Sequence, residues 1–362
     1  MHTEPVKLSE VISQVISTNK SKYLEWVKVP NSTSYQYIEQ ILEELTNPAF
    51  ILGKLNHELG HYDYQPLGKV LVVVSESYPL ATLMSAIALL LTGNQGLIKA
   101  NSTMPIVSHF LDELAQYYQH GITIEDWAGI KTFEYLNINN FDGVLLGGGE
   151  DLIEHFRAKT PAPIRLIEFG PKISVIALKK SSFSSEQITD LFYEYNLFAQ
   201  QVCSSPRFLI VSDEHAKGIF NLLIENSHLL EPFNYEQRLQ QSNLYKTLRL
   251  LGKAKNTLYN SYFDVKTGWI IEWHNDFDTL PDAGCIRIIS GTISVLLDKI
   301  STLYRNRTQV LGYAGFSFNE LMNFKFTRIC PLGLMHQRSR SNMSSHDGFF
   351  ELMSLVNIRD RI

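Results

Sequence analysis

The chain has 362 residues, of which 44% are hydrophobic and 19% are charged, and its formal net charge is −5 at pH 7. This length and composition indicate a folded globular protein, long enough for two or three domains around substantial cores. The charge pattern argues against nucleic acid as a partner, because the basic cluster Arg338-Ser-Arg340 is isolated and predicts a solvated loop.

Cysteine usage and hydropathy predict a cytoplasmic protein. The sequence has three cysteines, Cys203, Cys285 and Cys330, an odd and sparse set that fits a reducing compartment rather than a disulfide framework. The N-terminus has no continuous apolar signal core. The most apolar stretch, Pro79–Thr92, is too short to span a membrane and predicts a buried helix.

The first half of the chain predicts helices followed by alternating strands and helices. Residues 1–66 are expected to be mostly helical, because Leu8–Ser17 and Tyr35–Leu45 carry apolar residues at helical spacing. Strands are then expected at Lys69–Ser75, Gly96–Lys99 and Phe141–Leu146, with helices at Pro79–Thr92, Met104–His120 and Glu150–Ala158. This alternation predicts a parallel α/β sheet.

A second α/β unit is expected in the remainder of the chain. The expected strands are Arg165–Glu168, Ile173–Leu178 and Arg207–Val211, and the expected helices are Ser185–Gln201 and Glu214–Asn226. Residues 227–262 predict a polar helical region, and residues 263–320 a mixture of short strands and helices.

Cys203 is the first candidate for chemistry, because it follows a predicted helix and heads the turn Cys203-Ser-Ser-Pro206. A cysteine attacks as the thiolate, and backbone N–H groups in such a turn would stabilise that thiolate and hold an oxyanion. Taken alone, the residue is more simply explained as a buried, inert cysteine. That is also the preferred interpretation of Cys285 and Cys330, which lie in apolar runs.

Two features of the first α/β unit suggest a nucleotide site. Gly147, Gly148 and Gly149 lie between a strand and a helix N-terminus, where backbone N–H groups can approach a pyrophosphate. Lys99 ends a strand at the same edge of the predicted sheet, in reach of a ribose or phosphate. A tight βα turn and a solvated lysine are the simpler alternatives, because the G-x-G-x-x-G fingerprint is absent.

The string His57-Glu-Leu-Gly-His61 matches the H-E-x-x-H pattern of zinc proteases, in which Glu58 would act as the base. Against that interpretation, Gly60 lies inside the string, Pro66 ends any helix soon after, and a third ligand is not evident. A zinc metallopeptidase is therefore an alternative, coincidence is the preferred account, and no metal site is predicted.

Seven runs taken together resemble the aldehyde dehydrogenase superfamily and, within it, the LuxC-type acyl-CoA reductases. They occur in the family's order from about residue 67 to the C-terminus. The runs are Ser75–Leu80, Thr92–Lys99, Leu146–Gly149, Glu168–Ser174, Gln200–Pro206, Cys330–Gly333 and His346–Phe349.

The resemblance implies an aldehyde dehydrogenase-like α/β fold, with a Rossmann-type cofactor domain, a catalytic α/β domain and the active site between them. The implied domains are an N-terminal helical region over 1–66 that packs on the cofactor domain, an NADP(H)-binding domain over 67–178, a catalytic domain over 179–340 and a C-terminal segment over 341–362.

The implied reaction is the NADPH-dependent reduction of an acyl thioester to an aldehyde through an acyl-cysteine at Cys203. The resemblance makes Cys203 the nucleophile and Ser77 a helper of the oxyanion hole. It implies that Lys99, Ser102 and the three glycines at 147–149 bind the cofactor.

Three positions depart from the pattern or leave a role open. Ser77 replaces the asparagine of the oxyanion hole with a shorter hydroxyl. Ser102 stands in place of the glutamate that would repel a 2′-phosphate, which favours NADPH over NADH. Glu168 matches a hydrolytic general base that a reductase does not need, so its role is open. The altered Ser77 position keeps a second alternative, a non-catalytic scaffold that binds a carrier or synthetase partner.

The expected partners also come from the resemblance. The acyl donor is an acyl-CoA or an acyl-carrier protein, and the sequence does not distinguish them, because no basic patch marks either one. An acyl-activating synthetase and further copies of this chain are the other expected partners.

Overall fold

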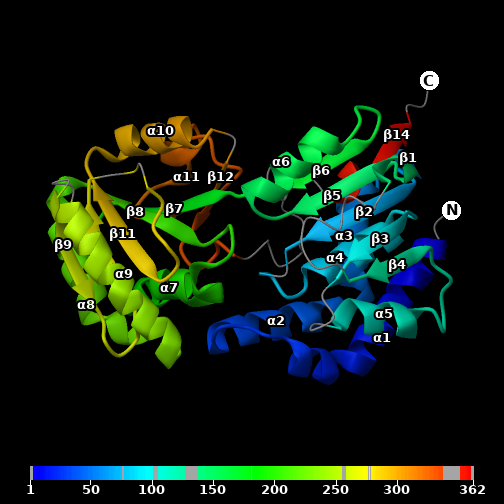
Figure 1. The fold of residues 1–362 in the computed structure, drawn as a ribbon, viewed down its shortest axis with the longest axis horizontal. Coiled ribbons are helices and arrows are strands. Elements are labelled where there is room, and N and C mark those ends of the chain that lie inside the picture. Colours follow the sequence, from blue (N-terminus) through cyan, green and yellow to red (C-terminus); the bar gives the residue numbers. More distant parts are fainter. Residues whose placement is uncertain are drawn as a thin grey trace. The chain divides into compact units, whose positions relative to one another are not determined.

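The computed structural model describes residues 3–75, 77–100, 105–126, 137–180, 182–254, 258–275, 277, 279–305, 307–336 and 351–359 (Figure 1). The chain forms two compact units. Unit 1 comprises Met1–Lys28, Tyr35–Pro171 and Arg338–Ile362, and unit 2 comprises Val29–Ser34 and Lys172–Gln337.

Unit 1 is built on a five-stranded parallel sheet in the order β4-β3-β2-β5-β6. Its strands are β2 (Lys69–Val74), β3 (Gln95–Lys99), β4 (Ile122–Glu125), β5 (Gly143–Gly147) and β6 (Arg165–Phe169). Its helices are α1 (Thr3–Trp26), α2 (Ser32–Leu45), α3 (Pro48–Leu59), α4 (Ala81–Leu91), α5 (Ile106–Leu114), α6 (Glu150–Lys159) and α12 (Glu351–Ser354), with a 3₁₀ turn at Ile138–Asn140. Separately, β1 (Asp63–Pro66) pairs antiparallel with β14 (Val356–Arg359).

The strand order of unit 1 is that of a Rossmann fold. From the central strand β2 the chain adds β3 and β4 on one side and then β5 and β6 on the other, so the winding direction reverses at β2 and β5. The apolar run of β2 is buried on both faces: α6 packs on one face, and α4 contacts the other. Ligands of such sheets bind where the winding reverses, outside the carboxyl ends of the strands.

Unit 2 is built on a seven-stranded sheet in the order β13-β12-β7-β8-β11-β10-β9. Its strands are β7 (Ile173–Leu178), β8 (Pro206–Val211), β9 (Leu258–Phe263), β10 (Ile270–His274), β11 (Cys285–Ser290), β12 (Thr308–Ala314) and β13 (Arg328–Pro331). Its helices are α7 (Ser185–Asn196), α8 (Asp213–Glu225), α9 (Tyr235–Ala254), α10 (Ile293–Leu303) and α11 (Phe318–Leu321), with 3₁₀ turns at Leu197–Gln200 and Ser227–Leu229. Neighbouring strands are parallel except for the β9–β10 pair.

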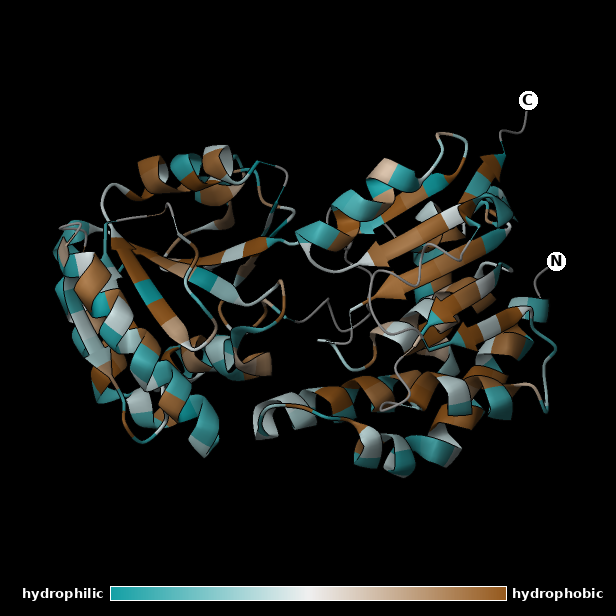
Figure 2. Ribbon diagram, viewed as in Figure 1, coloured by the Kyte–Doolittle hydropathy of each residue, from teal (hydrophilic) through white to brown (hydrophobic). Residues whose placement is uncertain are grey.

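The strands of unit 2 bury alternate residues on two faces. In β7, Ile176 and Leu178 join the core beneath α7 and α8, whereas Val175 and Ala177 join the core beneath α10 and α11. Figure 2 shows the apolar strands enclosed by helices whose outer faces are hydrophilic. Each face of the sheet therefore has its own hydrophobic core, and the Cys203 segment leads into β8, a strand that is buried on both faces.

The parallel α/β fold expected from the sequence is confirmed, with several local differences. The helix expected over Met104–His120 ends at Leu114, and the end of the N-terminal region expected to be mostly helical forms the strand β1. The helix expected over Ser185–Gln201 ends at Asn196, because the next residues leave helical geometry. The polar helical region expected over 227–262 includes α9 but ends in the strand β9. The division expected after residue 178 falls after Pro171, because β7 pairs with β8 and β12 of unit 2.

The described residues contain no helix that is both long and apolar enough to cross a membrane. The apolar run expected to form a buried helix does so: α4 spans Ala81–Leu91, and most of its side chains are buried. In unit 1, α1 contacts α4 and α5.

Candidate active site

Cys203 follows a turn whose backbone is strained. After α7 ends, Phe198, Ala199 and Gln200 adopt φ angles of 53°, 48° and 61°. Residues with a Cβ rarely adopt this left-handed conformation, and each costs on the order of 1 kcal/mol or more. Such strain persists only where the surroundings impose the conformation, which is common at functional sites.

The Gln200 side chain holds this turn against β11 through four hydrogen bonds. Its side chain is fully buried, and its Oε1 accepts from the N–H groups of Gly284 (2.8 Å) and Cys285 (3.0 Å). Its Nε2 donates to the carbonyl oxygens of Pro206 (2.9 Å) and Cys285 (3.2 Å). One amide therefore ties both ends of the Cys203 segment to β11.

A short segment from the N-terminal part of the chain, the 29–34 strap, contacts the same turn. The Ser34 hydroxyl accepts from the Phe198 N–H at 2.8 Å and donates to Asn31 Oδ1 at 2.5 Å. Asn31 Nδ2 also donates to the Asn196 carbonyl at 2.6 Å. Residues 29–34 thus belong to unit 2 and satisfy the polar groups that the end of α7 leaves open.

The structure brings together two of the motifs that carried the resemblance. Ser174, in the Glu168–Ser174 run, donates its hydroxyl to the Cys203 carbonyl at 2.9 Å and accepts from the Val310 N–H at 3.2 Å. Ser174 is opposite Pro206 in the β7–β8 pairing, at the amino ends of these strands. The peptide of Cys203 is therefore fixed to the central strands of the sheet.

Cys203 differs from the other two cysteines in its exposure and in its charged neighbour. Cys203 is half-buried, whereas Cys285 and Cys330 are buried and their thiol pKa values are raised by burial. Burial lowers the pKa of Arg207, while attraction to Asp282 and to the Cys203 thiolate opposes that effect. Of the three cysteines, Cys203 is therefore the most accessible.

In unit 1, the turn after β2 and the end of β5 meet where the winding of the sheet reverses. The Ser75 N–H donates to the Gly147 carbonyl at 2.5 Å, and the Gly148 N–H donates to the Phe169 carbonyl at 3.2 Å. Ser77 is exposed in this turn, and its Oγ lies 2.8 Å from Ser75 Oγ. Ser77 and the glycine turn therefore lie at the sheet edge where such folds bind ligands.

Gly149 leaves open space above the N-terminus of α6. A Cβ built on Gly149 would meet no atom within 4 Å, so nothing in the described protein requires glycine there. An unobstructed backbone at the start of a ten-residue helix fits the close approach of a pyrophosphate. Glu150 and Asp151 in the first turn of α6 partly offset the positive end of its dipole.

Lys99 is half-buried at the carboxyl end of β3, where it pairs in register with Val73 and Glu125. It therefore lies at the same edge of the sheet as the glycine turn, as the sequence predicted. Ser102 and the His346–Phe349 run lie outside the described residues.

Glu168 lies on β6 of unit 1 and forms a two-point ion pair with Arg157 of α6. Arg157 Nε donates to one carboxylate oxygen at 2.7 Å, and a second guanidinium nitrogen donates to the other at 2.5 Å. A carboxylate held in this way is neutralised by its partner and is poorly placed to act as a free general base.

The HELGH string does not form the two-histidine face of a zinc protease. Helix α3 ends at Leu59, so His61 lies beyond it, and both histidines are exposed. Glu58 is buried and accepts from the N–H groups of Leu352 (2.7 Å) and Met353 (3.4 Å). No group of three metal-binding side chains occurs among the described residues. The glutamate therefore anchors α12, and the zinc interpretation loses its structural basis.

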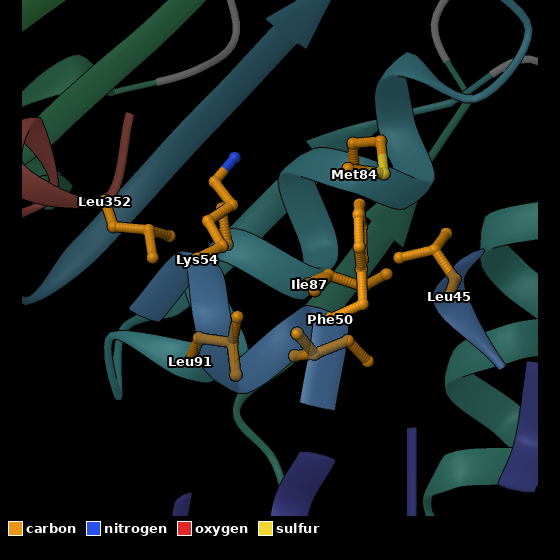
Figure 3. Close-up of a pocket in the computed structure, with 9 residues that line it drawn as sticks. Leu45, Phe50, Lys54, Met84, Ile87, Leu91 and Leu352 are labelled. Carbon is orange, nitrogen blue, oxygen red and sulfur yellow. The ribbon is translucent and has the colours of Figure 1, made fainter. Parts of the chain in front are cut away.

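An apolar pocket in unit 1 lies close to this anchor (Figure 3). It is lined by Leu45, Phe50, Ile51, Lys54, Met84, Ile87, Ala88, Leu91 and Leu352. Its charged member, Lys54, pairs with Glu351 at 2.8 Å and lies 3.9 Å from Glu58. The pocket lies among α2, α3, α4 and α12, and its lining contains none of the predicted site residues.

Comparison with known families identifies the chain. The family model described as acyl-CoA reductase (LuxC) matches residues 23–358. The chain belongs to the LuxC acyl-CoA reductase family. The match begins well before residue 67, where the sequence resemblance was expected to start, so the HELGH string lies inside the family region.

A named relative of this LuxC-family chain is the long-chain acyl-protein thioester reductase of Vibrio harveyi. The two are 22% identical over 174 residues, which are 46% of this chain and 36% of the relative. The alignment therefore spans about a third of the length of the relative.

Solved structures confirm the aldehyde dehydrogenase fold. The Methanocaldococcus jannaschii glyceraldehyde-3-phosphate dehydrogenase GapN, solved with NADP, aligns with a TM-score of 0.72 at 14% identity over 99% of this chain and 88% of its own. A variant of Pseudomonas syringae aldehyde dehydrogenase C, solved with NAD⁺ and octanal, aligns with a TM-score of 0.70 at 11% identity over 99% and 84%.

Sequence reasoning missed several residues that support Cys203. Gln200 and Ser174 belong to motifs that were recognised, but their hydrogen bonds depend on strands that are distant in sequence. Arg207 is the first residue of a predicted strand, and its position near the thiol follows only from the turn. Asn31 and Ser34 gave no signal, because they lie just before and within the first turn of α2, most of which belongs to the other unit.

Proposed function

We propose that this LuxC-family chain reduces an acyl thioester to an aldehyde with NADPH, through an acyl-enzyme at Cys203. The observation that carries the proposal is the half-buried Cys203, which is the least buried of the three cysteines and follows a strained turn that four hydrogen bonds of one buried amide hold in place. The family supports the acyl thioester as substrate.

Cys203 begins the reaction by attacking the thioester carbonyl carbon as a thiolate, and Arg207 stabilises that thiolate. A new C–S bond forms, the electron pair of the carbonyl moves to oxygen, and backbone N–H groups of the turn, helped by Ser77, stabilise that oxyanion. When the oxyanion collapses, the carrier leaves as its thiolate and takes up a proton. The acyl group is then bound to the sulfur of Cys203.

Lys99, Ser102 and the glycine turn at 147–149 would hold the nicotinamide cofactor, with its pyrophosphate over the open space at Gly149. When bound, NADPH supplies the hydride that reduces the acyl carbon. Cys203 then departs as thiolate from the resulting thiohemiacetal, and the aldehyde is released. The balance is one acyl thioester, one NADPH and one proton in, and one aldehyde, one thiol and one NADP⁺ out.

NADPH is preferred to NADH in this proposal because Ser102 offers no carboxylate against a 2′-phosphate. The acyl donor is a CoA ester or an acyl-carrier protein, and the name of the Vibrio harveyi relative supports a protein-bound acyl group. An acyl-activating synthetase and further copies of this chain are proposed as partners on the resemblance alone. The two-point ion pair with Arg157 leaves Glu168 a structural rather than a hydrolytic role.

The test measures NADPH consumption with a panel of acyl-CoAs and acyl-carrier proteins, together with intact mass. Wild type is expected to turn over and to gain one acyl group. Cys203→Ala is expected to lose both, and Cys330→Ala, which removes a buried thiol of the same unit, is expected to keep both. Absence of turnover and of an adduct with every donor would reject the proposal, and faster turnover with NADH would reject its cofactor part.

A further inference from the structure

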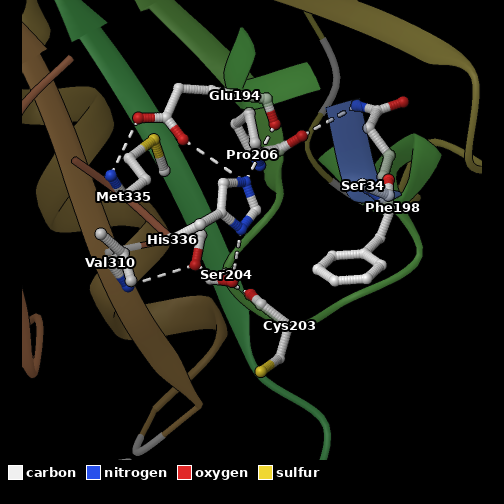
Figure 4. Close-up of polar contacts among 11 residues, drawn as sticks. Ser34, Glu194, Phe198, Cys203, Ser204, Pro206, Val310, Met335 and His336 are labelled. Atoms are coloured by element: carbon white, nitrogen blue, oxygen red, sulfur yellow. Dashed lines mark hydrogen bonds and ion pairs between the residues drawn. The ribbon is translucent and has the colours of Figure 1, made fainter. Parts of the chain in front are cut away.

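Next to Cys203 in unit 2, Ser204, His336 and Glu194 form a chain of polar contacts that has no part in the proposed reaction. Ser204 Oγ lies 2.8 Å from His336 Nδ1, and His336 Nε2 lies 3.1 Å from the Glu194 carbonyl oxygen (Figure 4). The Glu194 carboxylate accepts from the Met335 N–H at 2.8 Å through Oε1. His336 and Glu194 are buried, with 4% and 0% of their surface exposed.

The partners of His336 determine where its proton lies. A peptide carbonyl only accepts hydrogen bonds, so His336 Nε2 must carry the proton that bonds to the Glu194 carbonyl. In a neutral imidazole, Nδ1 is then the acceptor, and the Ser204 hydroxyl donates to it. The hydroxyl proton of Ser204 is therefore committed to His336 and is not directed at Cys203.

Both titratable members of the network are held in their neutral forms. Burial lowers the pKa of His336 to about 4, with the positive charge of Arg328 acting in the same direction. Burial raises the pKa of Glu194 to about 8, against the Met335 N–H and Arg328 but helped by Asp190. Glu194 Oε2 has no hydrogen bond within the described residues and lies 3.4 Å from His336 Nε2. With both groups mainly uncharged near pH 7, the hydrogen bonds to Met335, Glu194 and Ser204 fix the geometry of the network.

Ser174 and Ser204 fix the backbone on either side of the peptide bond that follows Cys203. Ser174 holds the carbonyl of Cys203, and the network holds the side chain of the next residue. Figure 4 shows the Cys203 side chain directed away from the imidazole. The backbone around the thiol is thereby fixed from both neighbouring positions.

We propose that Ser204, His336 and Glu194 are positioning residues that hold the peptide after Cys203 in one conformation. The Cys203 thiol and the neighbouring backbone N–H groups then keep a fixed orientation toward the acyl group. The proposal rests on the proposed function in one respect, namely that Cys203 is the nucleophile. It assigns no covalent role to Ser204, whose hydroxyl points toward the interior.

The test measures the alkylation rate of Cys203 by iodoacetamide across pH, with mass spectrometry to assign the site. Cys285 and Cys330 are buried, so the reagent reports on Cys203, and Cys203→Ala gives the background. Ser204→Ala is expected to slow alkylation about tenfold and to change its pH profile. Ser204→Thr, which keeps a hydroxyl, is expected to restore both to within about twofold.

His336→Gln and Glu194→Gln extend the test along the network, and His228→Gln is the matched control, because His228 is an exposed histidine of the same unit. His336→Gln is expected to act like Ser204→Ala, and the control like wild type. Wild-type rates and pH profiles in both Ser204→Ala and His336→Gln would overturn the proposal, even if their melting temperatures fall. If His336→Gln does not fold, the two Ser204 variants decide the outcome.

Alkylation needs neither an acyl donor nor NADPH, so it separates this proposal from the proposed function. Slow alkylation of Ser204→Ala in a protein that never forms an acyl adduct would support the positioning role and reject the reductase. Formation of the acyl adduct at the wild-type rate by a variant that alkylates normally would reject the positioning role alone.

Discussion

Glu194 shows how a single buried carboxyl can set the pH dependence of unit 2. Its pKa is about 8 in the folded protein, against 4.5 in the unfolded chain, because burial disfavours the charge. The folded state therefore retains a proton that the unfolded state has lost, so stability from this group is lost as pH rises from about 4.5 through 8. His336, with its pKa lowered to about 4, has the opposite effect on the acid side.

We expect Glu194→Gln to gain stability relative to wild type as pH rises from 5 to 8, by on the order of 1 kcal/mol per pH unit. Urea unfolding at a series of pH values measures the difference. Glu186→Gln is the control, because Glu186 is exposed on the same helix and the charge change is the same. Parallel pH dependences of wild type and Glu194→Gln would show that Glu194 is ionised in the fold.

At the scale of elements, the turn after α7 is expected to depend on Gln200 more than on any exposed neighbour. Gln200→Ala leaves the buried N–H groups of Gly284 and Cys285 without their acceptor and releases the strained backbone. We expect a loss of about 2–4 kcal/mol in the free energy of unfolding. Gln201→Ala, next to it but exposed, is expected to change stability by less than about 0.5 kcal/mol. Equal effects in chemical denaturation would contradict this account.

A second element-scale prediction concerns the contact between α3 and α12. Glu58→Ala removes the acceptor for two N–H groups of α12 and leaves Lys54 with one carboxylate partner. We expect a loss of about 3 kcal/mol and a higher rate of hydrogen exchange at the C-terminal segment. His61→Ala is expected to be neutral, and a chelator to change neither protein. If wild type bound zinc and both Glu58→Ala and His61→Ala lost it, the result would instead support the metal site.

At the scale of the whole molecule, the two units are expected to respond separately to ligands. NADPH at about 100 times its dissociation constant is expected to stabilise wild type by about 2.7 kcal/mol. Hydrogen exchange should slow in unit 1, around the turn after β2 and at the glycine turn. Acylation at Cys203 should instead slow exchange at residues 198–206 of unit 2.

Gly149→Asp tests the nucleotide site without weakening the fold. Aspartate is a favourable N-cap, and the built Cβ meets no atom, so stability is expected to stay within about 1 kcal/mol of wild type. The added charge is expected to weaken NADPH binding more than about tenfold and to abolish the ligand-induced rise in melting temperature. Gly149→Asn adds a side chain of similar size without the charge, so the difference between the two variants measures the effect of the charge on NADPH binding. Unchanged NADPH affinity in both variants would place the pyrophosphate elsewhere.

The sequence by itself determined the fold class and several of the candidate residues. Buried β-branched runs such as β2 can form little other than central strands, and the glycine turn after β5 is a local signal. Local signals also located Lys99 and the turn that contains Cys203. The strands and turns that hold these residues could be predicted because neighbouring residues in the chain decide them, whereas the roles of Lys99 and Cys203 stay predictions.

The tertiary structure decided what surrounds those residues, because the partners come from distant parts of the chain. The strain at Phe198–Gln200 is stable only against β11 and the 29–34 strap, and nothing within the segment indicates it. The sequence explained Glu58 only as part of a coincidental H-E-x-x-H string, and its contact with α12 appears only in the folded structure. His336 gained a role only when folding brought it to Glu194 and Ser204, because burial and hydrogen bonding, not sequence spacing, set the protonation state of a histidine.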